Sequence, residues 1–281
     1  MTGPSVWVDG VLLGAEVARV SPFDHGLLVG DGVFETLRVY DGVPFAWRRH
    51  TERLEHSAAG LGLRGPDRAT LRSAADAVLA ANGLEDARLR ITVTGGPAPL
   101  GSERGEAGPT VIVAASEARA WPPSERVVTV PWPRNERGAT AGLKTISYAE
   151  NVRALAYAHG HDASEALFLN TVGDVCEATG SNIFAVVEGA LHTPPAESGC
   201  LLGVTRALVL ELCEDLEIEA IVRSLPPETL ERADEAFLTS STREVQAVSH
   251  LDSVAFAAAP GPVTRRLAEA FRALVTRNPD P

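Results

Sequence analysis

Aspartate–glycine pairs and short apolar runs divide this chain into many brief segments, and this pattern restricts its fold more than any other feature. Asp9-Gly10 and Asp41-Gly42 lie at the ends of apolar strand-like runs, as the turns of β-hairpins do. Apolar residues at helical spacing occur in longer segments, which are residues 47–63, 67–83, 147–160, 203–216 and 262–277. Because strands and helices mix without strict alternation, the pattern favours an α+β protein over a doubly wound parallel sheet.

A proline pair at positions 122 and 123 interrupts the pattern, because two adjacent prolines break both helix and sheet. The 281 residues of the chain are enough for two medium-sized domains. We therefore expect a small N-terminal domain over residues 1–118, a linker over 119–125 and a larger C-terminal domain over 126–281.

The formal net charge of −12 argues against binding to nucleic acid or to anionic membranes. No apolar run reaches the ~18 residues of a membrane-spanning helix, and the first residues lack the basic and apolar regions of a signal peptide. Cys176, Cys200 and Cys213 form no zinc-binding pattern. We expect a cytoplasmic protein with reduced thiols, no metal site, and no nucleic-acid or membrane partner.

Lys144 is unusual because its neighbours are small or apolar, among them Leu143, Ile146 and Tyr148. Such a lysine is either a packed aliphatic stem with its ammonium in water or a chemically useful amine. The glycine-rich segments GDGVFE and VTGGPAPLG do not have the spacing of a dinucleotide site, and the sequence contains no nucleophile elbow. The common nucleotide and hydrolase motifs therefore do not explain this lysine.

Three further features could bind a phosphate, although each has a simpler interpretation. Residues 203–205 open a helix, where free N–H groups attract anions, but the segment could be a plain helix cap. The hydroxyl-rich segment 239–245 follows an expected strand and could equally be a serine/threonine turn. Arg53 could bind a phosphate through two N–H groups, whereas most helical arginines are solvated.

Six sequence blocks occur in a fixed order: GDGVFETLRV, HTERL, LKTISYAENVRAL, VCEATGSNIFAV, GCLLGVTR and TSSTREV. In that order they closely resemble the class IV aminotransferase family, the fold-type IV pyridoxal-phosphate enzymes, over about residues 7–275. The resemblance implies a small α/β N-terminal domain, a larger C-terminal domain with a barrel-like sheet, and pyridoxal 5′-phosphate bound between them. It also implies a small-molecule amine as substrate and a homodimer in which loops of the partner complete the pocket.

The same resemblance implies roles for individual residues. Lys144 matches the lysine that forms a Schiff base with the cofactor and then moves a proton, and an apolar setting favours the neutral amine that this needs. Glu177 matches the carboxylate beside the pyridine nitrogen, and Arg53 matches the arginine that binds phosphate. The other cofactor-binding positions are the backbone of Val204 and Thr205, Ser241 and Thr242 at the phosphate, and Ser181 and Asn182 after Glu177.

Two positions bear on which members of the family the chain resembles most. Gly95 stands where D-amino-acid aminotransferases place an arginine for the substrate carboxylate. Thr36 stands where branched-chain enzymes usually carry glycine and where aminodeoxychorismate lyases tend to have threonine near the reacting group. The sequence is therefore most like these lyases. The resemblance further places Phe34 in the pocket, and Arg104 and Arg134 in loops that approach the two carboxylates of a lyase substrate.

We therefore expect a lyase that converts 4-amino-4-deoxychorismate into 4-aminobenzoate and pyruvate for folate synthesis, with Lys144 and Thr36 as catalytic residues. The alternative is an amino-acid aminotransferase of the branched-chain or D-amino-acid type with the same cofactor and site. A third hypothesis is a binding protein that has kept the fold and lost the chemistry, and the presence of both Lys144 and Glu177 argues against it. Thr36 could also be an ordinary β-branched strand residue, and Phe34 a core aromatic.

Overall fold

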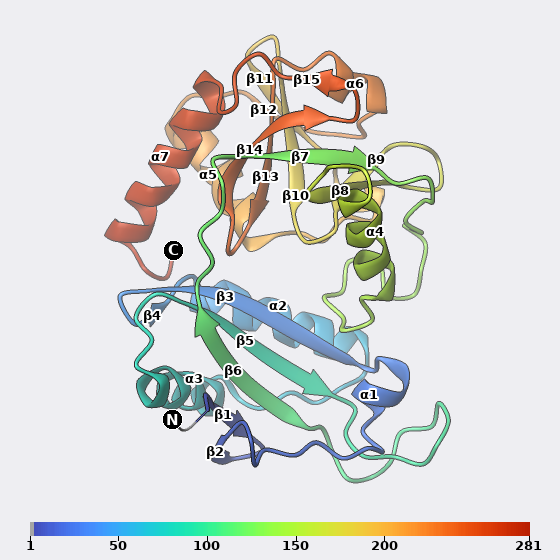
Figure 1. The fold of residues 1–281 in the computed structure, drawn as a ribbon, viewed down its shortest axis with the longest axis vertical. Helices are drawn as coiled ribbons and strands as arrows, with labels where there is room; N and C mark the ends of the chain where they lie inside the picture. Colours follow the sequence, from blue (N-terminus) through green and yellow to red (C-terminus); the bar gives the residue numbers. More distant parts are fainter. Residues whose placement is uncertain (1–2) are drawn as a thin grey trace. The chain divides into compact units, whose positions relative to one another are not determined.

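The computed structural model describes residues 3–281, and the contacts within it divide the chain into two compact units (Figure 1). Unit 1 combines the chain up to Arg119 with Leu143–Tyr148 and Pro279–Pro281. Unit 2 consists of Ala120–Gly142 and Ala149–Asn278. Each unit has its own β-sheet and its own buried apolar residues, so the two are described separately.

In the described part of unit 1, six strands form an antiparallel sheet with the order β2-β1-β6-β5-β3-β4. The turns predicted at Asp9-Gly10 and Asp41-Gly42 are present, and all four residues have the positive φ that tight hairpin turns require. The strands are β1 (Ser5–Val8), β2 (Val11–Gly14), β3 (Gly32–Tyr40), β4 (Val43–Pro44), β5 (Ala87–Thr94) and β6 (Val111–Glu117). The helices are α1 (His25–Val29), α2 (Trp47–Gly60) and α3 (Arg68–Asn82).

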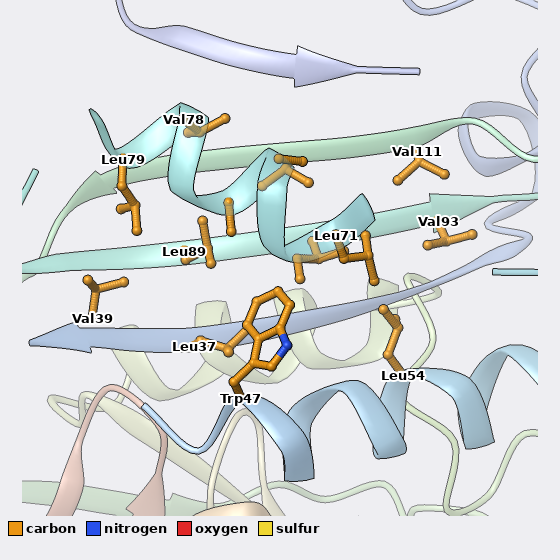
Figure 2. Close-up of a cluster of buried hydrophobic side chains, with 14 of the residues drawn as sticks. Leu37, Val39, Trp47, Leu54, Leu71, Val78, Leu79, Leu89, Val93 and Val111 are labelled. Atoms are coloured by element: carbon orange, nitrogen blue, oxygen red, sulfur yellow. The ribbon is translucent and has the colours of Figure 1, made fainter. Parts of the chain in front are cut away.

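Helices α2 and α3 cover one face of this sheet and enclose the core of unit 1. Successive residues of a strand point to opposite faces, so Val33 and Leu37 of β3 point to the same side and are fully buried. Figure 2 shows Leu37 beside the indole ring of Trp47 from α2, within a cluster to which α3 also contributes. Phe34 and Thr36 alternate with these residues and therefore lie on the opposite face of the sheet.

Unit 2 lies wholly within the described range, and its nine strands form a mixed sheet that curls into an incomplete barrel (Figure 1). The strand order is β12-β11-β10-β13-β14-β7-β8-β9, with β15 paired to β14. This sheet confirms the fold-type IV α+β architecture that the sequence blocks implied. The strands are β7 (Ser124–Thr129), β8 (Glu165–Leu169), β9 (Val175–Ala178), β10 (Asn182–Val187), β11 (Ala190–Thr193), β12 (Ala220–Val222), β13 (Glu235–Ser240), β14 (Glu244–Leu251) and β15 (Val254–Ala255). The helices are α4 (Ala149–His159), a 3₁₀ turn at Ala196–Ser198, α5 (Val204–Asp215), α6 (Pro227–Glu231) and α7 (Pro262–Arg277).

Two features of the units differ from the boundaries expected from the sequence. Ser124, inside the expected linker of residues 119–125, already begins β7, because it pairs with Ala247 of β14. The segment Leu143–Tyr148, expected with the C-terminal domain, groups with unit 1. The reason is backbone pairing with β3: the N–H of Phe34 donates to the Lys144 carbonyl at 3.0 Å.

Within residues 3–281, no helix is long and apolar enough to cross a membrane. In the same range, no three histidine, cysteine or acidic side chains gather closely enough to hold a metal ion. Cys176, Cys200 and Cys213 are buried free thiols.

Candidate active site

Lys144 is held against the sheet of unit 1 by its own backbone. Its N–H donates to Ser57 Oγ on α2 at 3.1 Å, and its carbonyl accepts from the N–H of Phe34. The half-buried side chain places Nζ 4.3 Å from the centre of the Phe34 ring and 5.9 Å from that of Tyr148. The two rings themselves meet edge to face at 5.2 Å. The ε-amine therefore lies against aromatic surface.

Arg90 also lies over the Phe34 ring, although its sequence pattern did not single it out. Its guanidinium lies 3.8 Å from the centre of the Phe34 ring, and its Nε donates to Thr92 Oγ1 at 3.1 Å. No carboxylate among the described residues pairs with it, and its burial lowers the pKa of the guanidinium. Arg90 lies directly opposite Thr36 in the β3–β5 ladder, so the two side chains share one face of the sheet. A half-buried cation without an acidic partner is available to bind an anion.

Arg53, expected at the phosphate, is fixed by a fully buried carboxylate. Its Nε donates to Glu35 Oε1 at 2.7 Å and its Nη2 to Oε2 at 2.8 Å, while His50 Nδ1 lies 2.7 Å from Oε2. Burial by itself would raise the pKa of Glu35, but the charges of Arg53 and His50 outweigh it and hold that pKa far below its usual range. Glu35 thus orients Arg53. A charged residue at a core-facing strand position was the signal that could have identified it.

The two arginines expected at the substrate carboxylates make contacts within the chain. Arg104 forms a bidentate ion pair with Asp31: its Nε donates to Oδ2 at 2.7 Å and its Nη2 to Oδ1 at 2.6 Å. This pair lowers the pKa of the Asp31 carboxyl. Arg134 donates to Asn151 Oδ1 at 3.2 Å, and its guanidinium stacks on Phe168. Their assignment to substrate remains a prediction, and each would have to exchange an existing partner for a substrate carboxylate.

In unit 2, Glu177 and Asn182 lie on either side of the turn between β9 and β10, and both side chains bind the backbone of the same residue, Leu201. Glu177 Oε2 accepts from the N–H of Leu201 at 3.0 Å, and Asn182 Nδ2 donates to the Leu201 carbonyl at 2.7 Å. Ser181, in the turn, is buried, and its Oγ has no hydrogen-bond partner within residues 3–281. The two strands therefore fix the chain just before α5.

The start of α5 has the geometry of an anion-binding site. Its N-cap is Gly203, and across the described chain no side chain caps the first N–H groups, which belong to Val204 and Thr205. A Cβ at Gly203 would lie 2.1 Å from Asn182 Oδ1, so only glycine lets the backbone approach so closely. Asn182 pairs with Thr239 across β10 and β13. The helix start therefore lies at the same end of the sheet as Thr239.

The hydroxyl-rich segment 239–245 continues from this end of the sheet. Thr239 is buried, and its Oγ1 has no hydrogen-bond partner in the described part of the chain. Ser241 and Thr242 follow, half-buried, in the turn between β13 and β14. The residues predicted to bind the cofactor at 181–182, 204–205 and 241–242 therefore lie near one another at the same end of the sheet.

These groups in unit 2 fit a phosphorylated pyridine. The uncapped start of α5 offers N–H donors to a phosphate. The buried hydroxyls of Ser181 and Thr239 have no hydrogen-bond partner within residues 3–281, so both can donate to a bound group. Glu177 supplies an anionic acceptor of the kind that keeps a ring nitrogen protonated. Pyridoxal 5′-phosphate, which carries both a phosphate and a pyridine nitrogen, matches this set of donors and acceptors.

Comparison with known proteins agrees with this assignment. The family model of amino-transferase class IV matches residues 32–251. A putative branched-chain-amino-acid aminotransferase of Methanocaldococcus jannaschii is 35% identical over 97% of this chain and 96% of its own. The aminodeoxychorismate lyase of Bacillus subtilis is 30% identical over 93% and 92%. The crystal structure of the branched-chain aminotransferase of the archaeon Thermoproteus uzoniensis with norvaline is 31% identical, with a TM-score of 0.91 and coverage of 97% and 94%.

The chain belongs to the class IV aminotransferase family. It is accordingly an enzyme that uses pyridoxal 5′-phosphate, and the resemblance of the six sequence blocks to this family is confirmed. The comparisons include both aminotransferases and a lyase, so they define the family and the cofactor.

Proposed function

We propose that the chain is an aminotransferase that acts on amino acids with an apolar side chain, such as the branched-chain amino acids. The observation that carries this proposal is Arg90, a half-buried cation without an acidic partner among the described residues, over the same aromatic ring as Lys144. When bound, pyridoxal 5′-phosphate supplies an aldehyde that takes up an amino group and a ring that accepts electrons.

In unit 1, the proposal gives the substrate-facing roles to three kinds of group. Lys144 holds the cofactor through its ε-amine and moves a proton at the α-carbon of the substrate. Arg90 binds the α-carboxylate through its planar N–H groups. Phe34 and Tyr148 provide an apolar wall beside the amine for the substrate side chain. Arg53, fixed by Glu35, binds phosphate.

In unit 2, the proposal gives the cofactor-binding roles to the residues at one end of the sheet. Glu177 keeps the ring nitrogen protonated, which strengthens the ring as an electron acceptor. The first N–H groups of α5, at Val204 and Thr205, bind phosphate together with Ser241 and Thr242. Ser181 and Asn182 line the cofactor.

The number of available arginines favours a substrate with one carboxylate. Arg38, on the same face of β3 as Thr36, already pairs with Asp86 at 2.6 Å, and Arg104 pairs with Asp31. Arg90 is the half-buried arginine of this sheet that has no such partner within residues 3–281. An α-amino acid with an apolar side chain has one carboxylate, whereas aminodeoxychorismate has two.

The second candidate function is the aminodeoxychorismate lyase expected from the sequence. Thr36 favours it, because this hydroxyl lies opposite Arg90 in the ladder and on the face that carries Phe34. In that case Thr36 assists proton transfer beside the reacting enolpyruvyl group, and Arg104 or Arg134 exchanges its partner for the second carboxylate.

Parallel assays of the purified, cofactor-loaded protein distinguish the two functions. With leucine, isoleucine or valine and a 2-oxo acid acceptor, an aminotransferase forms the corresponding branched-chain 2-oxo acid. With aminodeoxychorismate, a lyase releases pyruvate and 4-aminobenzoate. We expect 2-oxo acid formation without pyruvate release, and pyruvate release alone would replace the proposal by the lyase. If the protein formed neither the 2-oxo acid nor pyruvate, the result would support the hypothesis of an inactive binding protein.

We also propose that the chain acts as a homodimer, which the resemblance implied. Exposed apolar residues gather on and beside α1: Phe23 is 52% exposed, Leu27 70% and Val29 49%. Leu100, 74% exposed, lies in a loop that binds the same segment, since the Ala98 N–H donates to the Phe23 carbonyl. An apolar group of this kind is typical of an interface with a second subunit.

A charge placed in this surface is expected to separate the subunits. Light scattering after gel filtration should give the wild type twice the chain mass of 29.6 kDa, and Leu27→Asp should shift it towards 29.6 kDa, because a buried unpaired carboxylate opposes association. Val152→Asp is the matched control, since Val152 is 68% exposed on α4 of unit 2. A monomeric wild type, or equal effects of the two variants, would contradict the proposal.

A further inference from the structure

Thr179 stands between the two cofactor candidates Glu177 and Ser181, and its polar groups are all bound. Its N–H donates to the Ala166 carbonyl at 3.0 Å and to Glu165 Oε1 at 3.2 Å, and its hydroxyl also donates to Glu165 Oε1. Its carbonyl accepts from Asn151 Nδ2. The turn that carries Ser181 is therefore fixed by side chains of β8 and α4.

Glu165 makes contacts through both oxygens of its buried carboxyl group. The side chain is 2% exposed, and its Oε1 also accepts from the N–H of Ala166 at 3.0 Å. The second oxygen, Oε2, lies 3.1 Å from Nη2 of Arg243. One oxygen thus binds the turn between β9 and β10, and the other binds a cation.

Arg243 connects this carboxylate to the second cofactor-binding turn. It directly follows Ser241 and Thr242 in the turn between β13 and β14, and its guanidinium is 7% exposed. Its Nη1 donates to Gln246 Oε1 at 2.6 Å and to Glu125 Oε1 at 3.2 Å. Two buried carboxylates therefore share one arginine, but only Glu165 also binds Thr179.

We propose that Glu165 is a positioning residue for the cofactor, because it joins the turn at 178–181 to the turn at 241–243 through Thr179 and Arg243. Its carboxyl group binds Ala166, Thr179 and Arg243, and it acts on Ser181, Ser241 and Thr242 through the backbone that carries them. This inference rests on the proposed assignment of those residues to the cofactor.

Replacement of Glu165 by glutamine is expected to weaken both of its connections. Thr179 and Arg243 donate to different oxygens of Glu165, and glutamine has an acceptor oxygen at only one of these two positions and an NH₂ donor at the other. We expect the dissociation constant for pyridoxal 5′-phosphate, measured by titration of the full chain after cofactor removal, to rise about tenfold or more. Hydrogen exchange of the Thr179 amide in the cofactor-free chain should accelerate by a similar factor.

Glu125→Gln is the matched control, because it removes the other buried carboxylate bound to Arg243, whereas the hydrogen bonds to Thr179 come from Glu165. We expect it to lower the thermal stability of the chain while it changes cofactor affinity and Thr179 exchange less than twofold. Thr179→Val should behave like Glu165→Gln, and Thr179→Ser, which keeps the hydroxyl, should restore both properties. The threonine variants give the same test if Glu165→Gln does not fold.

The outcomes separate this inference from the proposed function. Equal weakening by Glu165→Gln and Glu125→Gln would show a general structural role and overturn it, as would wild-type affinity in Glu165→Gln. A wild-type chain that does not bind pyridoxal 5′-phosphate would overturn the cofactor assignment and this inference together. A chain that binds the cofactor but transfers no amino group would refute the proposed function alone, since affinity and exchange would still decide the role of Glu165.

Discussion

Lys144→Ala is expected to lower the rate of amino-group transfer by about a thousandfold or more, with little loss of folded protein. In the proposed function, the variant loses both the amine assigned to hold the cofactor and the group assigned to move the proton, and a positioned acid–base group alone is worth about 10²–10⁴-fold. The side chain is half-buried and its backbone holds the segment in place, so the fold does not depend on the amine. Initial rates and thermal unfolding of both proteins measure the two effects.

The composition of the chain makes the covalent part of this prediction easy to measure. Lys144 is the only lysine in the 281 residues, so it carries the only ε-amine. Borohydride treatment of the cofactor-loaded wild type should add one cofactor-derived mass to the peptide that contains residue 144, and the visible absorption band should disappear. Neither change should occur in Lys144→Ala.

Lys144→Arg is the control for the contact with the aromatic rings. An arginine keeps a positive charge near Phe34 and Tyr148, but its guanidinium stays protonated and cannot hold the cofactor aldehyde. We expect the rate to fall as far as in Lys144→Ala. Recovery of most of the rate in Lys144→Arg would mean that the charge, and not the amine, is what the site requires.

Much of the fold follows from local sequence features, because turns and helix ends are decided by neighbouring residues. Asp9-Gly10 and Asp41-Gly42 form tight turns between antiparallel strands, as predicted. The helix predicted over 67–83 begins after Asp67, whose side chain caps it, and ends at Gly83 in the left-handed conformation. These signals need no information from distant parts of the chain.

The features that the sequence analysis did not predict depend on pairing between distant segments. The proline pair beside Ser124 predicts a linker, and only pairing with β14 makes Ser124 a strand residue. Arg90 reads as one charged residue of an alternating strand, and its position over Phe34 follows from the register of β3 and β5. Lys144 belongs to unit 1 because its carbonyl accepts from the N–H of Phe34, a residue far away in the sequence. Local patterns do not specify register.

Glu35 is a further residue of this kind, and Glu35→Gln is expected to lower the free energy of unfolding at pH 7 by roughly 3–5 kcal/mol. The carboxylate is fully buried and receives two charge-assisted hydrogen bonds from Arg53 and one from His50. Glutamine has nearly the same shape but no charge, so it leaves the Arg53 guanidinium, which is 13% exposed, without its counter-ion. Urea unfolding of both proteins measures the difference.

The sign of the pH dependence follows from the direction of the pKa shift. The folded state lowers the pKa of Glu35 from its ordinary value of 4.5, so the carboxylate stabilises the fold fully above that pH and loses this contribution as the pH falls further. The difference between wild type and Glu35→Gln should therefore be the same at pH 7 and pH 8. Glu52→Gln is the control, because Glu52 and its partners Arg48 and Arg68 are all about half exposed and such pairs contribute roughly 0–1 kcal/mol each. If Glu35→Gln cost no more than Glu52→Gln, Arg53 would not need Glu35 as a fixed counter-ion.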